Sequence, residues 1–195
     1  MAFRGLAAAF VFCCAAGAAF AGDDGRRDRV MVFGGALMEG HFPGSSIIPF
    51  GSGFDGNGIA GAAYSRRLHA FSNGIEIGAE LGLAARFGRD LTGEAWAGFS
   101  LGHEGFTYGP VTVAPAVVLG LSAVTGATGI EARRAGKDGD PTLLFYLGPE
   151  IAFRHQRFPN VELVYRIHHR SGAWKVLGNM RDGYNGNIIG VRFGF

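Results

Sequence analysis

Residues 165–174 contain an imidazole and a hydroxyl at a spacing suited to ester hydrolysis. They read YRIHHRSGAW, so that His169 and Ser171 stand two positions apart. In a β-strand, residues two apart share one face, and the two side chains then lie next to each other. A histidine within reach of a serine hydroxyl can take its proton and make it a nucleophile toward an ester carbonyl. The pair is therefore a candidate base and nucleophile.

Three other motifs suggest chemistry, but their surroundings do not support it. Residues 98–102 read GFSLG and match the nucleophile elbow of soluble hydrolases, which needs a helix after Ser100, whereas the following HEGFTYGP predicts a turn. Residues 51–56 imitate a dinucleotide fingerprint without a surrounding βαβ unit. His103 beside Glu104 has no second histidine at a usable metal-ligand spacing. We predict no metal and no organic cofactor, and a soluble hydrolase built on Ser100 remains an alternative.

The elements that position His169 and Ser171 are strands, because the hydrophobic pattern of the chain repeats every second residue. One face of the segment 161–168 is apolar, with Val161, Leu163, Tyr165 and Ile167, and the other contains Glu162, Val164, Arg166 and His168. Similar alternation occurs at 75–87, 143–155 and 189–195. This parity assigns His169 and Ser171 to the apolar face, and His168 and Arg170 to the opposite face.

The two faces together predict a membrane barrel. The apolar face is broad and aliphatic, whereas the other combines glycine with isolated Glu and Arg, which suits a narrow polar lumen surrounded by lipid. The length after residue 21 allows about 22 residues for each of eight strands with its connection, enough for spans of about 10 residues. We predict an all-β fold, an eight-stranded antiparallel up-and-down transmembrane β-barrel. The expected strands lie near 28–37, 57–68, 74–87, 91–103, 114–124, 142–155, 160–171 and 187–195.

Irregular segments are also expected. Residues 38–56, 133–141 and 172–186 are interpreted as loops of this one domain. Pro149 falls inside the sixth strand and argues against it, because proline has no N–H group for the ladder; a bulge would accommodate it.

Composition and the N-terminal segment agree with an exported protein. The chain has 195 residues with 34 glycines, 48% hydrophobic and 17% charged residues, and a formal net charge of +2. This balance argues against disorder, and the absence of a basic cluster argues against nucleic-acid binding. Residues 1–21 are interpreted as a signal peptide, with Arg4 before an apolar run and a small-x-small cleavage site. Cys13 and Cys14 lie inside it, so the predicted barrel domain, 22–195, contains no thiol.

The ends of the predicted strands place the His–Ser pair relative to the membrane. With the C-terminus on the periplasmic side, the seventh strand ends at the outer surface and residues 172–186 form an extracellular loop. His169 and Ser171 then lie level with the outer leaflet, which contains lipopolysaccharide. The final Phe195, after Phe193 and Val191, resembles the C-terminal signature of bacterial outer-membrane barrels. We therefore predict location in the bacterial outer membrane.

These features resemble the lipid A 3-O-deacylase (PagL-type), or acyloxyacyl hydrolase, family of outer-membrane barrels. That family has a His-x-Ser motif near the end of the penultimate strand, followed by a glycine-containing loop and a short last strand. His169-Arg170-Ser171 matches the motif, and Asn185-Gly186 resembles the turn before the last strand. The resemblance implies Ser171 as nucleophile, His169 as general base, and lipid A of lipopolysaccharide as the substrate within outer-membrane lipid.

The third member of the site departs from the family pattern. The family has a glutamate at the start of the last strand, where this chain has Asn187. An asparagine oxygen can hold a histidine in one tautomer, but it does not stabilise the imidazolium as a carboxylate does. Asp182 in the preceding loop is the alternative acid, and both residues stay open. The expected oxyanion donors are the backbone N–H groups of Gly172 and Ala173.

The missing glutamate also supports a second hypothesis. In this hypothesis the protein is a small outer-membrane barrel without catalysis, with a role in adhesion or envelope structure. The sequence leaves open the preferred acyl chain and whether the barrel forms a homodimer.

Overall fold

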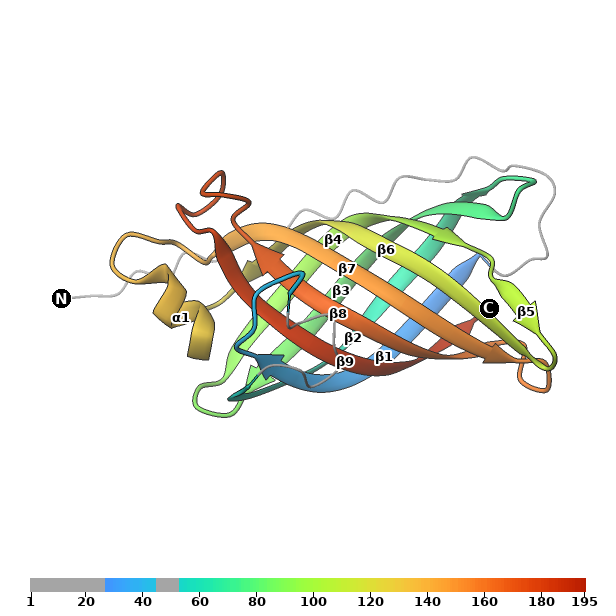
Figure 1. The fold of residues 1–195 in the computed structure, drawn as a ribbon, viewed down its shortest axis with the longest axis horizontal. Helices are drawn as coiled ribbons and strands as arrows, with labels where there is room; N and C mark the ends of the chain where they lie inside the picture. The colour runs from blue at the N-terminus through green and yellow to red at the C-terminus, as the bar shows by residue number, and fades with distance from the viewer. Residues whose placement is uncertain (1–26, 45–52) are drawn as a thin grey trace.

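The structure, a computed structural model, describes residues 27–44 and 53–195. The described strands form one closed antiparallel barrel (Figure 1), in which each long strand pairs with its neighbours in the chain, β1 pairs with β9, and β4 pairs with β6. The eight long strands are β1 (Asp28–Met38), β2 (Phe54–Ala70), β3 (Ile75–Phe87), β4 (Thr92–His103), β6 (Val111–Val124), β7 (Leu143–His155), β8 (Val161–Ser171) and β9 (Asp182–Gly194). The predicted eight-stranded up-and-down fold is confirmed. The predicted signal peptide, residues 1–21, lies outside the described residues.

The two ends of the barrel differ. One end, here called the turn end, contains the start of β1, the end of β9 and the short β5 (Phe106–Tyr108), which extends the hairpin with β6. The opposite end, the loop end, contains the β6–β7 connection with helix α1 (Gly129–Ala135) and the β8–β9 loop. Figure 1 shows α1 and β5 at opposite ends of the barrel. The His–Ser pair at the end of β8 therefore belongs to the loop end.

The alternation in the sequence sorts side chains between the outer wall and the lumen. On the outer wall, Leu163 is 53% and Ile189 is 54% exposed. On the lumen side of the same strands, Arg166 and Ile188 are almost completely buried. The outer wall is thus apolar over its length, as a lipid-facing barrel requires.

The lumen is filled by paired charges and by rings packed against them. Arg166 donates hydrogen bonds of 2.6 and 2.7 Å to Glu80 and of 2.6 and 2.8 Å to Glu150. Trp96 packs among the rings of the lumen and donates from Nε1 to Glu80 at 2.9 Å. A Cβ at Gly82, across from Trp96, would lie 2.0 Å from the indole. The glycines of the inward face thus make room for large polar and aromatic side chains.

Helix α1 closes the loop end of the lumen. Glu131 of α1 is fully buried and accepts hydrogen bonds from Arg86, at 2.7 Å, and from Arg170. The prediction of a plain loop at 133–141 was therefore wrong in its first part, because α1 continues to Ala135. Within the described residues, no helix combines the length and hydropathy needed to cross a bilayer.

Two further boundaries differ from the prediction. The β7–β8 ladder lacks pairs at Gly148 and Pro149 but keeps its register, from Leu147↔His169 to Glu150↔Arg166, so the missing N–H is accommodated within the strand without a bulge. Strand β9 begins at Asp182 instead of residue 187, because Asp182 already pairs with β8 and Asn185 pairs with both β8 and β1. This earlier start changes which asparagine lies beside His169.

Candidate functional site

His169 and its neighbour His168 lie on opposite sides of the barrel wall. His168 is fully buried in the lumen, where Nε2 lies 2.9 Å from Glu94 and Nδ1 lies 3.2 Å from the Tyr146 hydroxyl. His169 lies on the outer wall and stacks on the ring of Phe42, with the centroids 4.8 Å apart. The predicted parity is confirmed. Phe42 leaves the outward-facing imidazole only 6% exposed.

The imidazole of His169 is held by Asn185, not by Asn187. Its Nδ1 lies 2.6 Å from Oδ1 of Asn185, its direct cross-strand partner, and Asn185 Nδ2 in turn donates to the carbonyl of Gly40. Asn187 is paired with Ile167 instead, and its Oδ1 accepts a hydrogen bond of 2.8 Å from Tyr165. The expectation that Asn187 holds the histidine is corrected, because β9 begins five residues earlier than predicted. An amide oxygen accepts hydrogen bonds but does not donate them, so Nδ1 carries the proton and Nε2 is the basic nitrogen.

Replacing these two asparagines separately tests this assignment. Asn185→Ala removes the acceptor that orients the imidazole, and we expect ester hydrolysis by the purified barrel to fall about tenfold, the value of one hydrogen bond. Asn187→Ala is the matched control, since it removes a neighbouring amide on the same strand and face; its rate should stay within about a factor of two. The reverse order of effects would restore Asn187 as the partner of His169.

Ser171 ends β8 beside a tight turn. Its Oγ donates to the carbonyl of Arg181 at 2.9 Å and accepts the N–H of Ala173 at 2.9 Å. Ala173 has φ of 45° and Trp174 of 56°, so the turn passes through the left-handed region directly after Gly172. Among the hydrogen bonds of the described residues, none joins Ser171 to His169. The hydroxyl must leave the Arg181 carbonyl before it can reach Nε2.

The predicted oxyanion donors are placed unequally. The N–H of Ala173 is bonded to the serine Oγ itself, so in this conformation it does not point to an empty oxyanion position. Gly172 lies where a Cβ would be 2.1 Å from the Met180 carbonyl and 2.4 Å from that of Leu177. Only glycine fits at position 172, because the two carbonyls approach it so closely.

Asp182, the alternative acid, contacts a different histidine. Its Oδ2 lies 2.6 Å from Nδ1 of His41, in the segment that follows β1. Asp182 is the cross-strand partner of Ser171, so its carboxylate lies beside the serine without contacting His169. Of the two third members considered from the sequence, Asn187 and Asp182, neither holds His169.

A groove at the loop end contains the serine. It has a volume of about 1200 Å³, somewhat larger than ordinary ligand sites. Its apolar lining includes Leu119, Phe145 and Leu147 of the outer wall, beside His169 and Ser171. Its polar rim includes the carboxylates of Asp138 and Asp182 and three cations for which no ion pair occurs within the described part of the chain, Lys137, Lys175 and Arg181. The apolar lining of the groove suits the acyl chains of a lipid, and the unpaired cations on its rim suit an anionic headgroup.

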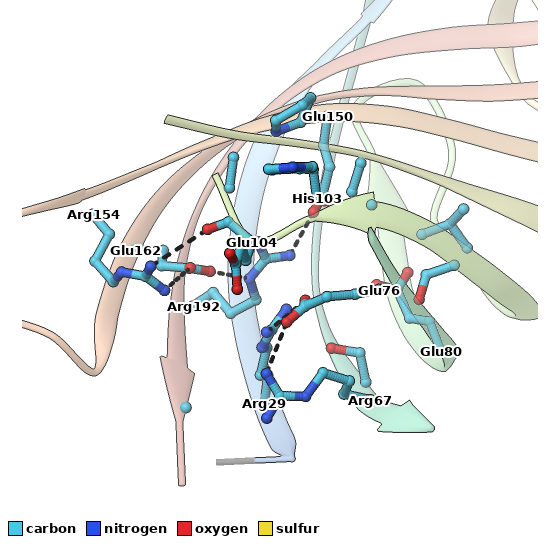
Figure 2. A pocket seen from close by; sticks show the side chains of 18 of the residues that line it. Arg29, Arg67, Glu76, Glu80, His103, Glu104, Glu150, Arg154, Glu162 and Arg192 are labelled. Carbon is cyan, nitrogen blue, oxygen red and sulfur yellow. Dashed lines mark hydrogen bonds and ion pairs between the residues drawn. The ribbon is translucent and has the colours of Figure 1, made fainter. Parts of the chain in front are cut away.

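The other cavity lies in the lumen at the turn end (Figure 2). Its volume is about 250 Å³, and its charged side chains pair with one another: Figure 2 shows Arg29 and Arg67 directed at Glu76, and Arg154 and Arg192 at Glu162. These internal pairs leave little charge for a ligand.

Two of the three competing sequence motifs fall in this lumen cavity. Ser100 and His103 line it, and β4 continues through Ser100 into a turn, not into a helix. His103 stacks on Phe106, with centroids 4.5 Å apart. No group of three or more metal-ligating side chains occurs among the described residues. Of the glycine fingerprint, Gly51 lies outside the described residues, and Gly56 lies within β2.

Three residues of the site were not identified from the sequence. Asn185 was assigned to a turn, although its odd-numbered parity with Ile189 and Val191 is a usable signal for the outer face. His41 and Phe42 belong to a segment without periodicity, and only the folded chain brings them to β8.

Comparison with known proteins supports the fold. No family model and no curated protein matches the sequence. Among solved structures, the outer membrane enzyme PagL superposes with a TM-score of 0.57 at 13% identity, covering 86% of this chain and 99% of that chain. Neisserial surface protein A (NspA) gives a TM-score of 0.52 at 17% identity, covering 86% of this chain and 96% of that chain. The chain therefore has the fold of small outer-membrane barrels.

Proposed function

We propose that this protein is an outer-membrane ester hydrolase that removes the 3-O-linked acyl chain from lipid A. The observation that carries the proposal is the placement of Ser171 and His169 together on the outer wall, beside an apolar groove at the loop end. A nucleophile on the outer wall is directly accessible to lipid of the surrounding membrane. In that environment polar side chains are costly and are kept for function.

The side chains that line the groove are an argument for a phosphorylated, acylated substrate. Leu119, Phe145 and Leu147 provide a surface for an acyl chain, and Lys137, Lys175 and Arg181 border it on the solvent side. Lipid A combines several acyl chains with anionic phosphates, so it matches both parts. The likeness to PagL is consistent with this activity through the shared fold.

In the proposed reaction, Ser171 attacks the ester carbonyl while Nε2 of His169 takes its proton. Asn185 keeps the proton of His169 on Nδ1 and so leaves Nε2 as the acceptor. The acyl-enzyme is then hydrolysed by water. Every proton transfer uses side chains of this chain.

A structural barrel without catalysis is the second candidate. It is favoured by the hydrogen bonds that hold Ser171 Oγ between Arg181 and Ala173, and by the absence of a carboxylate on His169. In that case the groove would bind lipid without cleaving it.

Mass spectrometry of host lipid A separates the two candidates. Expression of the full precursor in a Gram-negative host is expected to convert most lipid A to a species lacking one hydroxyacyl chain. The control is the same host without the gene. A folded barrel in the outer membrane, shown by heat-modifiable electrophoretic mobility, together with unaltered lipid A would reject the enzyme and favour the structural candidate.

A further inference from the structure

A second imidazole lies beside the candidate nucleophile. His41 Nδ1 and Asp182 Oδ2 are 2.6 Å apart. The segment that contains His41 is anchored by Arg134, which donates to the carbonyls of Glu39, at 2.9 Å, and Gly40, at 3.2 Å, and whose Nη2 lies 3.4 Å from His41 Nδ1. The pair is thus fixed to both α1 and the start of β9.

A change in strand register brings this pair to Ser171. The β8–β9 pairing shifts between His169 and Ser171, so that two residues of β9, 183 and 184, stand opposite Arg170. This bulge makes Asp182 the direct partner of Ser171. Side chains of such partners share a face, with Cβ atoms about 4.5–5.5 Å apart. His41, Asp182 and Ser171 accordingly line the same groove.

The two imidazoles have chemically different partners. Asn185 offers His169 a neutral amide oxygen, which holds the tautomer with a basic Nε2. Asp182 offers His41 a carboxylate oxygen, which accepts a hydrogen bond from an N–H on Nδ1. An amide beside one imidazole and a carboxylate beside the other suit the two rings to different roles in proton transfer.

We propose that His41, held by Asp182, is the proton donor to the leaving alcohol, while His169 accepts the proton of Ser171. This inference rests on the proposed function and divides between two histidines the work that one histidine does in most serine hydrolases. The carboxylate that is absent beside His169 is present beside His41, as Asp182.

The protons balance over the cycle. In acylation, the Ser171 proton moves to His169 Nε2, Oγ bonds to the acyl carbon, and the ester C–O bond breaks as the leaving oxygen takes a proton from His41 Nε2. In deacylation, a water molecule gives a proton to His41 Nε2 and its oxygen bonds to the acyl carbon. The bond from that carbon to Oγ then breaks, and Oγ recovers its proton from His169. Ester and water become acid and alcohol.

Two esters of one fatty acid test the proposal in the detergent-solubilised barrel. A simple alkyl ester has a leaving group that needs a proton, whereas a 4-nitrophenyl ester releases a phenolate that does not. For His41→Gln we expect hydrolysis of the alkyl ester to fall about 100-fold, within the range of general acid catalysis. With the nitrophenyl ester, we expect a burst of one nitrophenolate per protein followed by a stall, because deacylation also uses His41. Intact-protein mass spectrometry should then show one acyl group on the barrel.

The controls separate this proposal from the proposed function. Asp182→Asn, like His41→Gln, should slow hydrolysis of the alkyl ester and make the nitrophenyl ester reaction stall after its burst. His69→Gln, at the distant end of β2, should match wild type with both esters. Equal slowing of both esters without an acyl adduct, or no slowing of either, overturns the role of His41. Failure of the wild-type barrel to cleave either ester, or a burst that survives in Ser171→Ala, overturns the proposed function instead.

Discussion

Replacing Ser171 by alanine is expected to leave host lipid A fully acylated. The substitution removes the nucleophile while keeping the end of β8, so the barrel should still fold and show heat-modifiable mobility. Removing the nucleophile or its histidine lowers kcat by about 10⁶ in serine proteases, which puts the expected residual rate below detection. Mass spectrometry of lipid A from hosts expressing each variant measures the effect.

The chain contains a matched control in its other candidate serine. Ser100 lines the lumen cavity at the turn end and has no helix after it, so Ser100→Ala should deacylate lipid A as wild type does. His169→Ala should be as inactive as Ser171→Ala, and the double variant no worse than either, because the two residues act as a unit. Full deacylation by Ser171→Ala would remove this serine from the mechanism and return Ser100 to consideration.

The strands and the parity of the site were predictable because alternation is a local property of the sequence. Leu163, Tyr165 and Ile167 alternate with Glu162 and Arg166, and a one-residue error would have turned His169 into the lumen. Strong alternation in the strand that leads into the motif therefore determines the face of His169.

The partners of the site were not predictable in the same way. Asn185 follows Gly183 and precedes Gly186, and such a glycine-rich stretch resembles a turn. Strand β9 begins there because β1 and β8 both pair with it. The bulge that brings Asp182 to Ser171, and the segment that brings His41 to Asp182, depend on tertiary contacts that no local pattern records.

Helix α1 was missed for a related reason. It has only seven residues, too few to show helical periodicity. Its position is determined by Glu131, which enters the lumen and contacts Arg86 and Arg170. A single buried charge of this kind has meaning only once its partners on distant strands are known.

The ion pairs of the lumen lead to the largest expected effect on stability. Arg166 is fully buried and donates to both Glu80 and Glu150. Arg166→Met leaves Glu80 in the lumen without its cation, whereas Glu150 keeps Arg192 at 2.5 Å. Breaking a buried ion pair from one side costs about 3–5 kcal/mol, so we expect the free energy of unfolding to fall by that amount.

Urea unfolding in detergent micelles, followed by the fluorescence of Trp96 beside Glu80, measures this loss. Arg66→Met is the control, because Arg66 is half exposed and lies 3.8 Å from Asp28, a geometry that contributes at most about 1 kcal/mol. Adding Glu80→Gln to Arg166→Met should recover part of the stability, since it removes the uncompensated charge while keeping an acceptor for Trp96. If Arg166→Met were as stable as Arg66→Met, the lumen would have to contain enough water to solvate Glu80, and the paired charges would not be what holds the barrel wall in place.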